Sequence, residues 1–77
     1  MENGNTIDAA RLAEAVIGYQ YAIDMEWAFA GEHGICGEYW DEGQTREHDR
    51  IVSDVLERRR SIGEMIGAIR GDPGFRL

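Results

Sequence analysis

The most regular pattern of hydrophobic and polar positions lies in the second half of the chain, where seven residues recur at alternating spacings of four and three. They are His48, Val52, Val55, Arg59, Ile62, Ile66 and Ile69. Five of the seven are aliphatic, and the spacing is typical of a helix that packs lengthwise along another helix. We therefore predict a helix over residues 46–70, capped by Thr45 and stopped by residues 71–74, which contain two glycines and a proline.

The first half of the chain predicts a second helix over residues 7–30, because this stretch contains no proline and a single glycine, Gly18. Asn5 or Thr6 could cap its N-terminus. On a helical wheel its apolar residues form two adjacent seams rather than one. One seam is Leu12, Val16, Tyr19 and Ile23, and the other is Ala10, Ile17, Tyr21 and Ala28. Two seams indicate that this helix has more than one helical neighbour.

The two predicted helices match in length and are joined by a glycine-containing loop over residues 31–44, which favours an antiparallel helical hairpin. We predict an all-α fold with a single domain over residues 1–77, ending in a tail over residues 71–77 that could fold back. Two hairpins in a homodimer would form a four-helix bundle and use both seams of the first helix. A monomeric hairpin with a packed loop is the alternative. Gly63 and Gly67 form a ridge of small residues that could mark a close helix crossing.

Four polar residues interrupt the predicted apolar seams: Gln20, Asp24, His48 and Arg59. In a symmetric hairpin Asp24 lies within a turn of His48, and Gln20 lies about one turn from Arg59, so we predict these as buried pairs. An Asp24–Arg59 pair across a dimer is the alternative. A polar residue at a seam position typically fixes the helix register and the number of partners, and this is the role that we predict. Catalysis by Asp24 has less support, since no nucleophile or oxyanion donor is evident nearby.

The charge of the chain is acidic and unevenly distributed. Its 15 acidic and eight basic residues give a net charge of −7, and every basic residue is an arginine. Residues 1–45 hold nine of the acids and only one arginine, Arg11. An acidic surface repels phosphate, so we expect no direct binding to nucleic acid or to an anionic membrane. It favours a partner protein with a basic surface, such as a nucleic-acid-binding protein, and the alternative is a solvated surface that binds nothing.

The centre of the predicted loop is the candidate partner-binding surface. Its five successive residues are Glu38, Tyr39, Trp40, Asp41 and Glu42. Tyrosine and tryptophan are enriched at binding hot spots, and carboxylates suit a basic groove. The alternative is that Trp40 and Tyr39 cover the end of the helix pair and so stabilise a small domain.

The sequence predicts no metal site, no cofactor and no catalytic constellation. Carboxylate-bridged metal bundles use Glu-x-x-His on their helices, but Thr45 and Ala30 stand three residues before His48 and His33. Cys36 is the only cysteine, which excludes an intrachain disulfide and suits a reducing compartment. The sequence contains neither an apolar run of about 18 residues nor a signal-peptide pattern. We therefore expect a cytoplasmic protein that does not span a membrane.

Together these features favour a small acidic protein-interaction module, an inhibitor or adaptor that occupies a basic surface of its partner. Small acidic helical proteins of phages and mobile elements inhibit host defence enzymes in this way, some by mimicking nucleic acid. That comparison is one of class and rests on no shared motif. A homo-oligomeric structural subunit is the second hypothesis, supported by the apolar seams. A carboxylate metal-binding enzyme is the third and has the least support.

Overall fold

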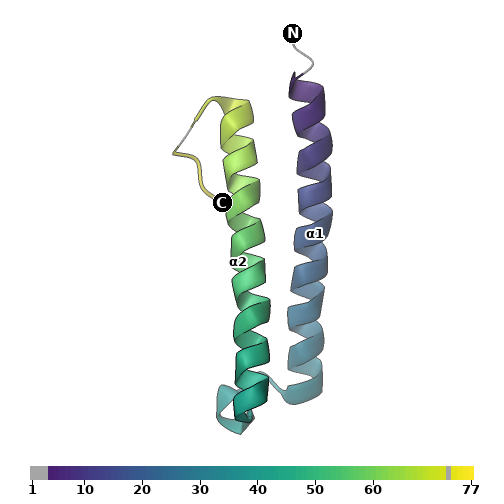
Figure 1. The fold of residues 1–77 in the computed structure, drawn as a ribbon, viewed down its shortest axis with the longest axis vertical. Helices are drawn as coiled ribbons and strands as arrows, with labels where there is room; N and C mark the ends of the chain where they lie inside the picture. The colour runs from purple at the N-terminus through teal and green to yellow at the C-terminus, as the bar shows by residue number, and fades with distance from the viewer. Residues whose placement is uncertain (1–3, 73) are drawn as a thin grey trace.

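A computed structural model describes residues 4–72 and 74–77 and consists of two long helices joined at one end (Figure 1). Helix α1 spans Gly4–His33, and helix α2 spans Glu42–Arg70. A single turn of 3-10 helix, η1, covers Gly37–Tyr39 in the connection between them. The two helices lie side by side and run in opposite directions, and the described residues contain no strand. The predicted all-α antiparallel hairpin is therefore confirmed.

The hairpin is elongated, with extents of 54 × 21 × 15 Å and a radius of gyration of 16.0 Å. A globular domain of this length has a radius of gyration of about 11–12 Å. The solvent-accessible surface of 5791 Å² also exceeds the value of roughly 4,700 Å² expected for a compact protein of 8.7 kDa. A single hairpin therefore leaves far more surface exposed than a compact domain of the same mass.

Helix α2 begins four residues earlier than predicted because Asp41, not Thr45, is its N-cap. The Asp41 carboxylate accepts a hydrogen bond from the backbone N–H of Gln44 at 2.7 Å. The side-chain oxygen of Gln44 accepts a hydrogen bond from the backbone N–H of Asp41 at 3.0 Å, which completes a capping box. At the other end, Gly71 adopts a left-handed backbone with φ of 72° and ends the helix where the sequence predicted.

Helix α1 continues three residues beyond its predicted end and finishes at His33. There Gly34 adopts a φ of 83°, and its N–H donates to the carbonyl of Ala30 at 2.8 Å. The connection between the helices therefore covers residues 34–41 rather than the predicted 31–44. Only glycine takes this left-handed conformation without strain, which explains why the helix ends at this position.

The contact between α1 and α2 is made by few residues. The buried apolar residues are Ala22 and Phe29 on α1 and Ile51 and Ile62 on α2. On α1 the half-buried residues at heptad spacing from them are Leu12, Ala15, Tyr19, Glu26 and His33. Among the described residues, no large side chain is completely buried. The core of one hairpin is thus a single narrow seam, which is a small source of stability for a chain of this length.

Two contacts show which residues of the helices lie level with each other. The ring of Phe29 lies 5.4 Å from the ring of His48. Further along, the Arg58 guanidinium crosses α1 at Gly18, where an added Cβ would lie 2.5 Å from Arg58 Nη1. Gly18 therefore provides space for an arginine from α2. Arg58, and not Arg59, is the arginine that reaches α1.

The predicted seam on α2 lies at the edge of the helix contact rather than at its centre. Of its residues Ile62 is buried, His48, Val52, Val55 and Ile66 are half-buried, and Arg59 and Ile69 are exposed. The line that faces α1 is displaced by about one residue and includes Ile51 and Arg58. The physical reason is that α2 packs on two sides. Helix α1 covers one side, and the C-terminal tail covers the other.

The C-terminal tail folds back along α2, as the sequence predicted, on the side away from α1 (Figure 1). Gly63 and Gly67 are buried, and Leu77 and Phe75 lie over them. The N–H of Asp72 donates to the Gly67 carbonyl at 2.7 Å, and the N–H of Phe75 donates to the Asp72 carbonyl at 3.1 Å. The ridge of small residues therefore accommodates the chain's own tail, and the prediction of a helix crossing there is wrong.

Candidate functional site

The end of the hairpin is closed by an aromatic cluster built around Trp40. Its indole ring lies 5.1 Å from the ring of Phe29 and 4.4 Å from the ring of His48. The indole N–H donates to the carbonyls of His33 and Gly34, each at 3.1 Å, at the C-terminal end of α1. Trp40 therefore covers the end of the helix pair and satisfies carbonyls that the helix end leaves without an intrahelical partner.

Gln44 connects this cluster to the start of α2. Its Nε2 lies 3.0 Å from Nδ1 of His33, while its Oε1 takes part in the capping box at Asp41. His48, predicted to pair with Asp24, instead packs against aromatic rings. The backbone on both sides of the loop is thus held by specific hydrogen bonds.

Beside the cluster lies a group of exposed side chains that we call the loop-end surface, consisting of Ile35, Glu38, Tyr39 and Glu42. Ile35 is 84 % exposed and Tyr39 is 81 % exposed. Within η1 the backbone N–H of Tyr39 donates to the carbonyl of Cys36 at 3.2 Å, which shapes this segment. Large exposed apolar side chains close in sequence to carboxylates are typical of a protein-binding surface.

The structure separates the five residues predicted to bind a partner. Glu38, Tyr39 and Glu42 are exposed on the loop-end surface, whereas Trp40 and Asp41 have structural roles in the aromatic cluster and the N-cap. Sequence reasoning missed Ile35. A single large aliphatic residue within a glycine-rich loop was the signal that could have identified it.

Helix α2 carries arginines that are paired with acids on the same helix. Arg58 Nε lies 3.0 Å from the Asp54 carboxylate, and Arg60 pairs with both Glu57 and Glu64. The hydrogen bond that Arg60 donates to Glu57, followed by the charges of Glu57 and Glu64, raises the pKa of Arg60. In the part of the chain that the structure describes, Glu38 and Glu42 have no such arginine partner. Among the described residues Asp24, Glu47 and Asp49 also have none, so the unpaired acidic charge is spread along the hairpin and includes the loop end.

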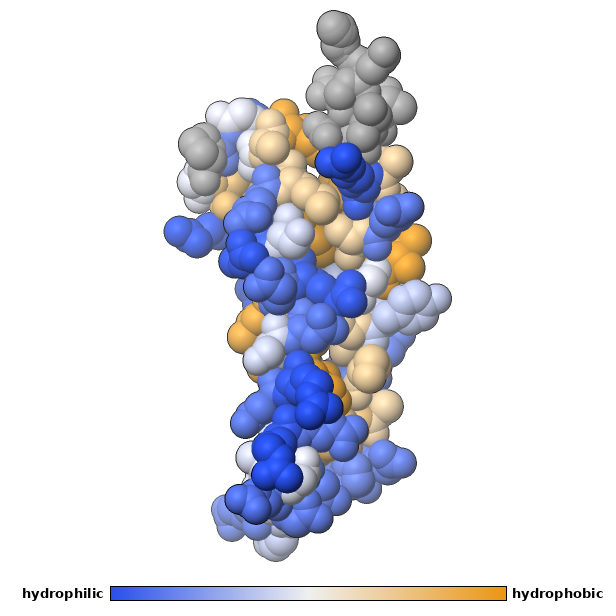
Figure 2. Space-filling model, in the orientation of Figure 1, coloured by the Kyte–Doolittle hydropathy of each residue, from blue (hydrophilic) through white to orange (hydrophobic). Residues whose placement is uncertain are grey.

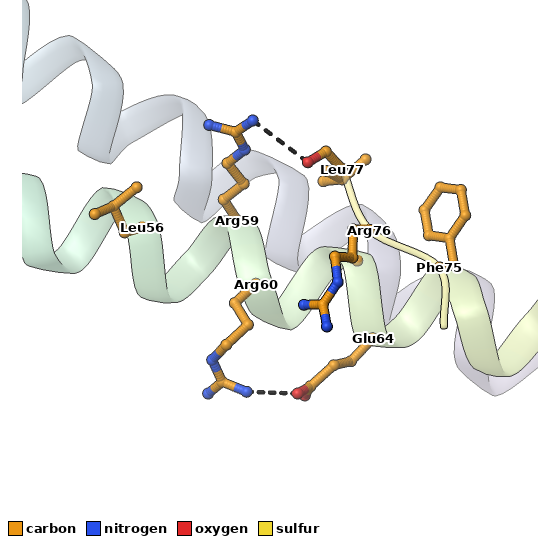
Figure 3. A pocket seen from close by; sticks show the side chains of 8 residues that line it. Leu56, Arg59, Arg60, Glu64, Phe75, Arg76 and Leu77 are labelled. Carbon is orange, nitrogen blue, oxygen red and sulfur yellow. Dashed lines mark hydrogen bonds and ion pairs between the residues drawn. The ribbon is translucent and has the colours of Figure 1, made fainter. Parts of the chain in front are cut away.

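An open groove lies between α2 and the C-terminal tail (Figure 3). It is lined by Leu56, Arg59, Arg60, Gly63, Glu64, Phe75, Arg76 and Leu77. Arg59 donates to the carbonyl of Leu77 at 3.4 Å, and Arg60 pairs with Glu64 (Figure 3). The Arg59 contact joins α2 to the tail, whereas the Arg60–Glu64 pair lies within α2.

The largest uncovered apolar region lies on the sides of α1 that α2 does not cover. Its exposed residues, which we call the outer face of α1, are Ala13, Val16, Ile17, Gln20, Tyr21, Asp24, Met25, Trp27 and Gly31. Five of them are large hydrophobic residues, and Asp24 is charged; two further exposed acids, Glu14 and Glu32, lie along one edge of this face, between Tyr21 and Met25. Figure 2 shows apolar residues gathered over α1 and polar residues over α2. A helix that is apolar on all sides is normally covered on all sides, so this face lacks a partner in the single hairpin.

Gln20 and Asp24 lie on the outer face of α1 and not between the helices. Both are exposed, and Gln20 Nε2 donates to Asp24 Oδ1 at 3.3 Å. The predicted buried pairs of these residues with His48 and Arg59 are therefore wrong for the hairpin. The physical reason is that α1 has apolar residues on every side, and it is the side carrying Ala22 that faces α2.

The described residues hold no group of three or more His, Cys, Asp or Glu side chains placed to bind a metal ion. Cys36 is exposed and has a free thiol. Neither helix, over its described length, combines the span and the hydropathy needed to cross a membrane.

No protein-family model, curated protein or solved structure matches this chain. Function therefore has to be inferred from the loop-end surface and from the outer face of α1.

Proposed function

We propose that this protein is a small acidic protein-interaction module, an inhibitor or adaptor that docks its loop-end surface on a basic surface of a partner protein. The observation that carries the proposal is the exposure of Ile35 and Tyr39 beside the carboxylates of Glu38 and Glu42. An apolar centre bordered by acids complements a basic surface that contains an apolar pocket. The free thiol of Cys36 suits a reducing compartment such as the cytoplasm.

The anchoring of the loop supports this proposal. Trp40 ties the loop to the end of α1, and Asp41 ties it to the start of α2. A surface that is already ordered loses less conformational entropy when a partner binds, so more of the contact energy appears as affinity.

The test is affinity capture from a nuclease-treated lysate of the native host, followed by mass spectrometry. The wild-type protein should retain one or two stoichiometric proteins. A variant carrying Ile35→Ala and Tyr39→Ala should retain at least about tenfold less of them, because hot-spot residues each contribute more than about 1 kcal/mol. Glu38→Gln with Glu42→Gln should weaken capture and reduce its sensitivity to salt.

Leu56→Ala is the matched control for this experiment, since Leu56 is an exposed aliphatic residue on α2, outside the loop. The Leu56→Ala protein should retain the same proteins as wild type. Equal retention by the Ile35→Ala, Tyr39→Ala variant would exclude the loop-end surface as the contact.

A second proposal is that the chain also forms a homodimer through the outer face of α1, as expected of an assembly subunit. Five large exposed hydrophobic residues favour it. So does the accessible surface of 5791 Å², which exceeds that of a compact protein by about 1,000 Å². This excess is similar to the area of roughly 800 Å² that each partner covers in a standard interface. Such a dimer contains four helices, as the two apolar seams of α1 led us to expect.

Sedimentation velocity tests the homodimer with a pair of matched variants. Ile17 on α1 is 56 % exposed and Leu56 on α2 is 55 % exposed, so glutamate should leave the hairpin folded at either position. Ile17→Glu should weaken the dimer at least about tenfold because it buries an unpaired charge, whereas Leu56→Glu should leave it intact. A wild-type protein that is monomeric at all concentrations would rule out this second proposal.

A further inference from the structure

The outer face of α1 contains a heptad seam of its own. Its six residues are Ala13, Ile17, Gln20, Asp24, Trp27 and Gly31, and all six are exposed. Alternating spacings of four and three place them on one line along the helix. At 100° per residue, this line lies on the opposite side of α1 from Ala22, which is buried against α2.

The order of residues along this seam is the same from either end. A small residue stands at each end, a large apolar residue comes next, and a polar pair occupies the middle. The spacings are symmetric as well, with their centre at residue 22. Two identical surfaces related by a two-fold axis must be complementary to themselves, and a palindromic seam meets this requirement.

We propose that a second copy of this chain docks on this seam with its α1 antiparallel, about a two-fold axis level with residue 22. The inference rests on the proposed homodimer and adds its orientation and register. Ala13 then faces Gly31 of the second copy, so small residues allow close approach at both ends. Ile17 faces the large ring of Trp27, and Gln20 faces Asp24.

Charge decides between the two orientations. In a parallel pair in register, Asp24 faces Asp24 of the second copy, which buries two like charges side by side. In the antiparallel pair, each Asp24 carboxylate faces a Gln20 amide that can donate to it. Each Gln20 side chain already lies 3.3 Å from Asp24 of its own chain, so four side chains form one polar group at the axis. Gln20 and Asp24 thus fix the register between chains, not within the hairpin.

The apolar area on the outer face is sufficient for such a dimer. Ile17 and Trp27 on the seam, with Val16 and Tyr21 on its flanks, still expose roughly 500 Å² per chain, given that an aromatic side chain covers about 150–250 Å². Two copies together contribute about 1,000 Å², the lower bound for a biological interface, before the small and polar residues of the seam are added. On the outer side of α2, by contrast, Arg60 forms ion pairs with Glu57 and Glu64. The second copy therefore docks on α1 alone, and the four helices lie in a row with the two α1 helices at the centre.

Disulfide cross-linking tests this register directly. In a Cys36→Ser background, Ala13→Cys and Gly31→Cys are made as separate proteins, mixed under reducing conditions and then oxidised. Ala13 is exposed, and a Cβ at Gly31 meets no atom within 4 Å, so both variants should fold. The mixed disulfide should exceed either homodisulfide by at least about tenfold, because only the mixed pair comes within the Cα separation of roughly 7 Å that a disulfide allows.

Each outcome tests the register of the two α1 helices separately from the existence of the homodimer. In the antiparallel pair two Ala13 residues lie about 27 Å apart along the axis and cannot be joined. A dominant Ala13→Cys homodisulfide would therefore establish a parallel pair and overturn the inference. So would the absence of the mixed disulfide in a protein that sedimentation shows to be dimeric. A monomeric Cys36→Ser protein, with a monomeric wild type beside it, would overturn both the register and the homodimer.

Discussion

At the scale of single residues, Tyr39 and Trp40 show how neighbouring aromatic side chains take opposite roles. Tyr39 points into solvent, whereas Trp40 packs on Phe29 and His48 and donates to two carbonyls of the α1 end. Removal of Trp40 would therefore affect folding as well as binding. Only exposed residues of the loop are suitable for testing partner contact.

Trp40→Phe should lower the free energy of unfolding by about 1–2 kcal/mol, because phenylalanine retains much of the ring packing but cannot donate to His33 and Gly34. Tyr39→Phe is the control and should change stability by less than about 0.5 kcal/mol. Urea denaturation followed by circular dichroism measures both. Equal stability of the two variants would mean that the indole hydrogen bonds contribute nothing to the fold.

The sequence contained part of this information. Asp41 followed three residues later by Gln44 is a capping-box pattern, whereas the predicted cap, Thr45, is followed three residues later by His48, which cannot complete such a box. The hydrogen bonds of Trp40 could not be predicted in the same way. They depend on where the loop carries the indole in space, and no spacing along the chain encodes that position.

At the scale of elements, the two helices differ in how well their patterns predicted their packing. In α2 apolar residues gather on one side, so the predicted seam was displaced by only about one residue from the true contact line. In α1 apolar residues surround the helix, so the wheel could not show which side faces α2. That ambiguity led to the wrong partners for Gln20 and Asp24, although the expectation of more than one neighbour came from the same pattern.

The two glycines beneath the C-terminal tail should respond differently to alanine. At Gly67 an added Cβ would lie 2.7 Å from the backbone oxygen of Asp72, so Gly67→Ala should displace the tail and destabilise the protein by about 1–3 kcal/mol. At Gly63 the nearest atom would be 3.5 Å away, so Gly63→Ala should stabilise it by about 0.5–1 kcal/mol through helix propensity. Thermal unfolding measures both changes in stability. Changes in the same direction for the two variants would contradict the packing of the tail on these glycines.

Gly18→Ala provides a third test of the helix contact. The new methyl group would meet only the end of the flexible Arg58 side chain, which can move aside. We therefore expect a gain of about 0.5 kcal/mol, since alanine favours a helix by roughly 1 kcal/mol over glycine and the shift of Arg58 offsets part of this. A loss of stability in urea denaturation would show that the packing of Arg58 against Gly18 contributes more to stability than the helix propensity of alanine does.

At the scale of the whole molecule, the narrow core of one hairpin and the uncovered outer face of α1 have the same cause, which is that α1 packs against α2 on one side only. If the dimer contributes to stability, unfolding depends on protein concentration. The midpoint of thermal unfolding should rise by about 3–5 °C for each tenfold increase in concentration. Scanning calorimetry over two decades of concentration measures this rise. The Ile17→Glu protein should show a constant midpoint, and a constant midpoint for wild type would contradict the dimer.

The proposed antiparallel dimer also determines where the loop-end surfaces lie. Each hairpin is 54 Å long, and two hairpins in opposite directions carry their loop ends at opposite ends of the assembly. The dimer would then engage two basic partners at once rather than one partner twice. Such bivalent contact raises the overall affinity only when both partner sites can be reached together.

The positions of the two tryptophans have a spectroscopic consequence. Trp27 is 72 % exposed on the outer face of α1, whereas Trp40 lies in the aromatic cluster, and the chain has no other tryptophan. Indole emission shifts to shorter wavelength when water leaves the ring. In a Trp40→Phe protein the emission would follow the covering of α1 alone, and in a Trp27→Phe protein it would follow the closing of the loop end. The native chain thus carries separate optical reporters for assembly and for folding, with no added label.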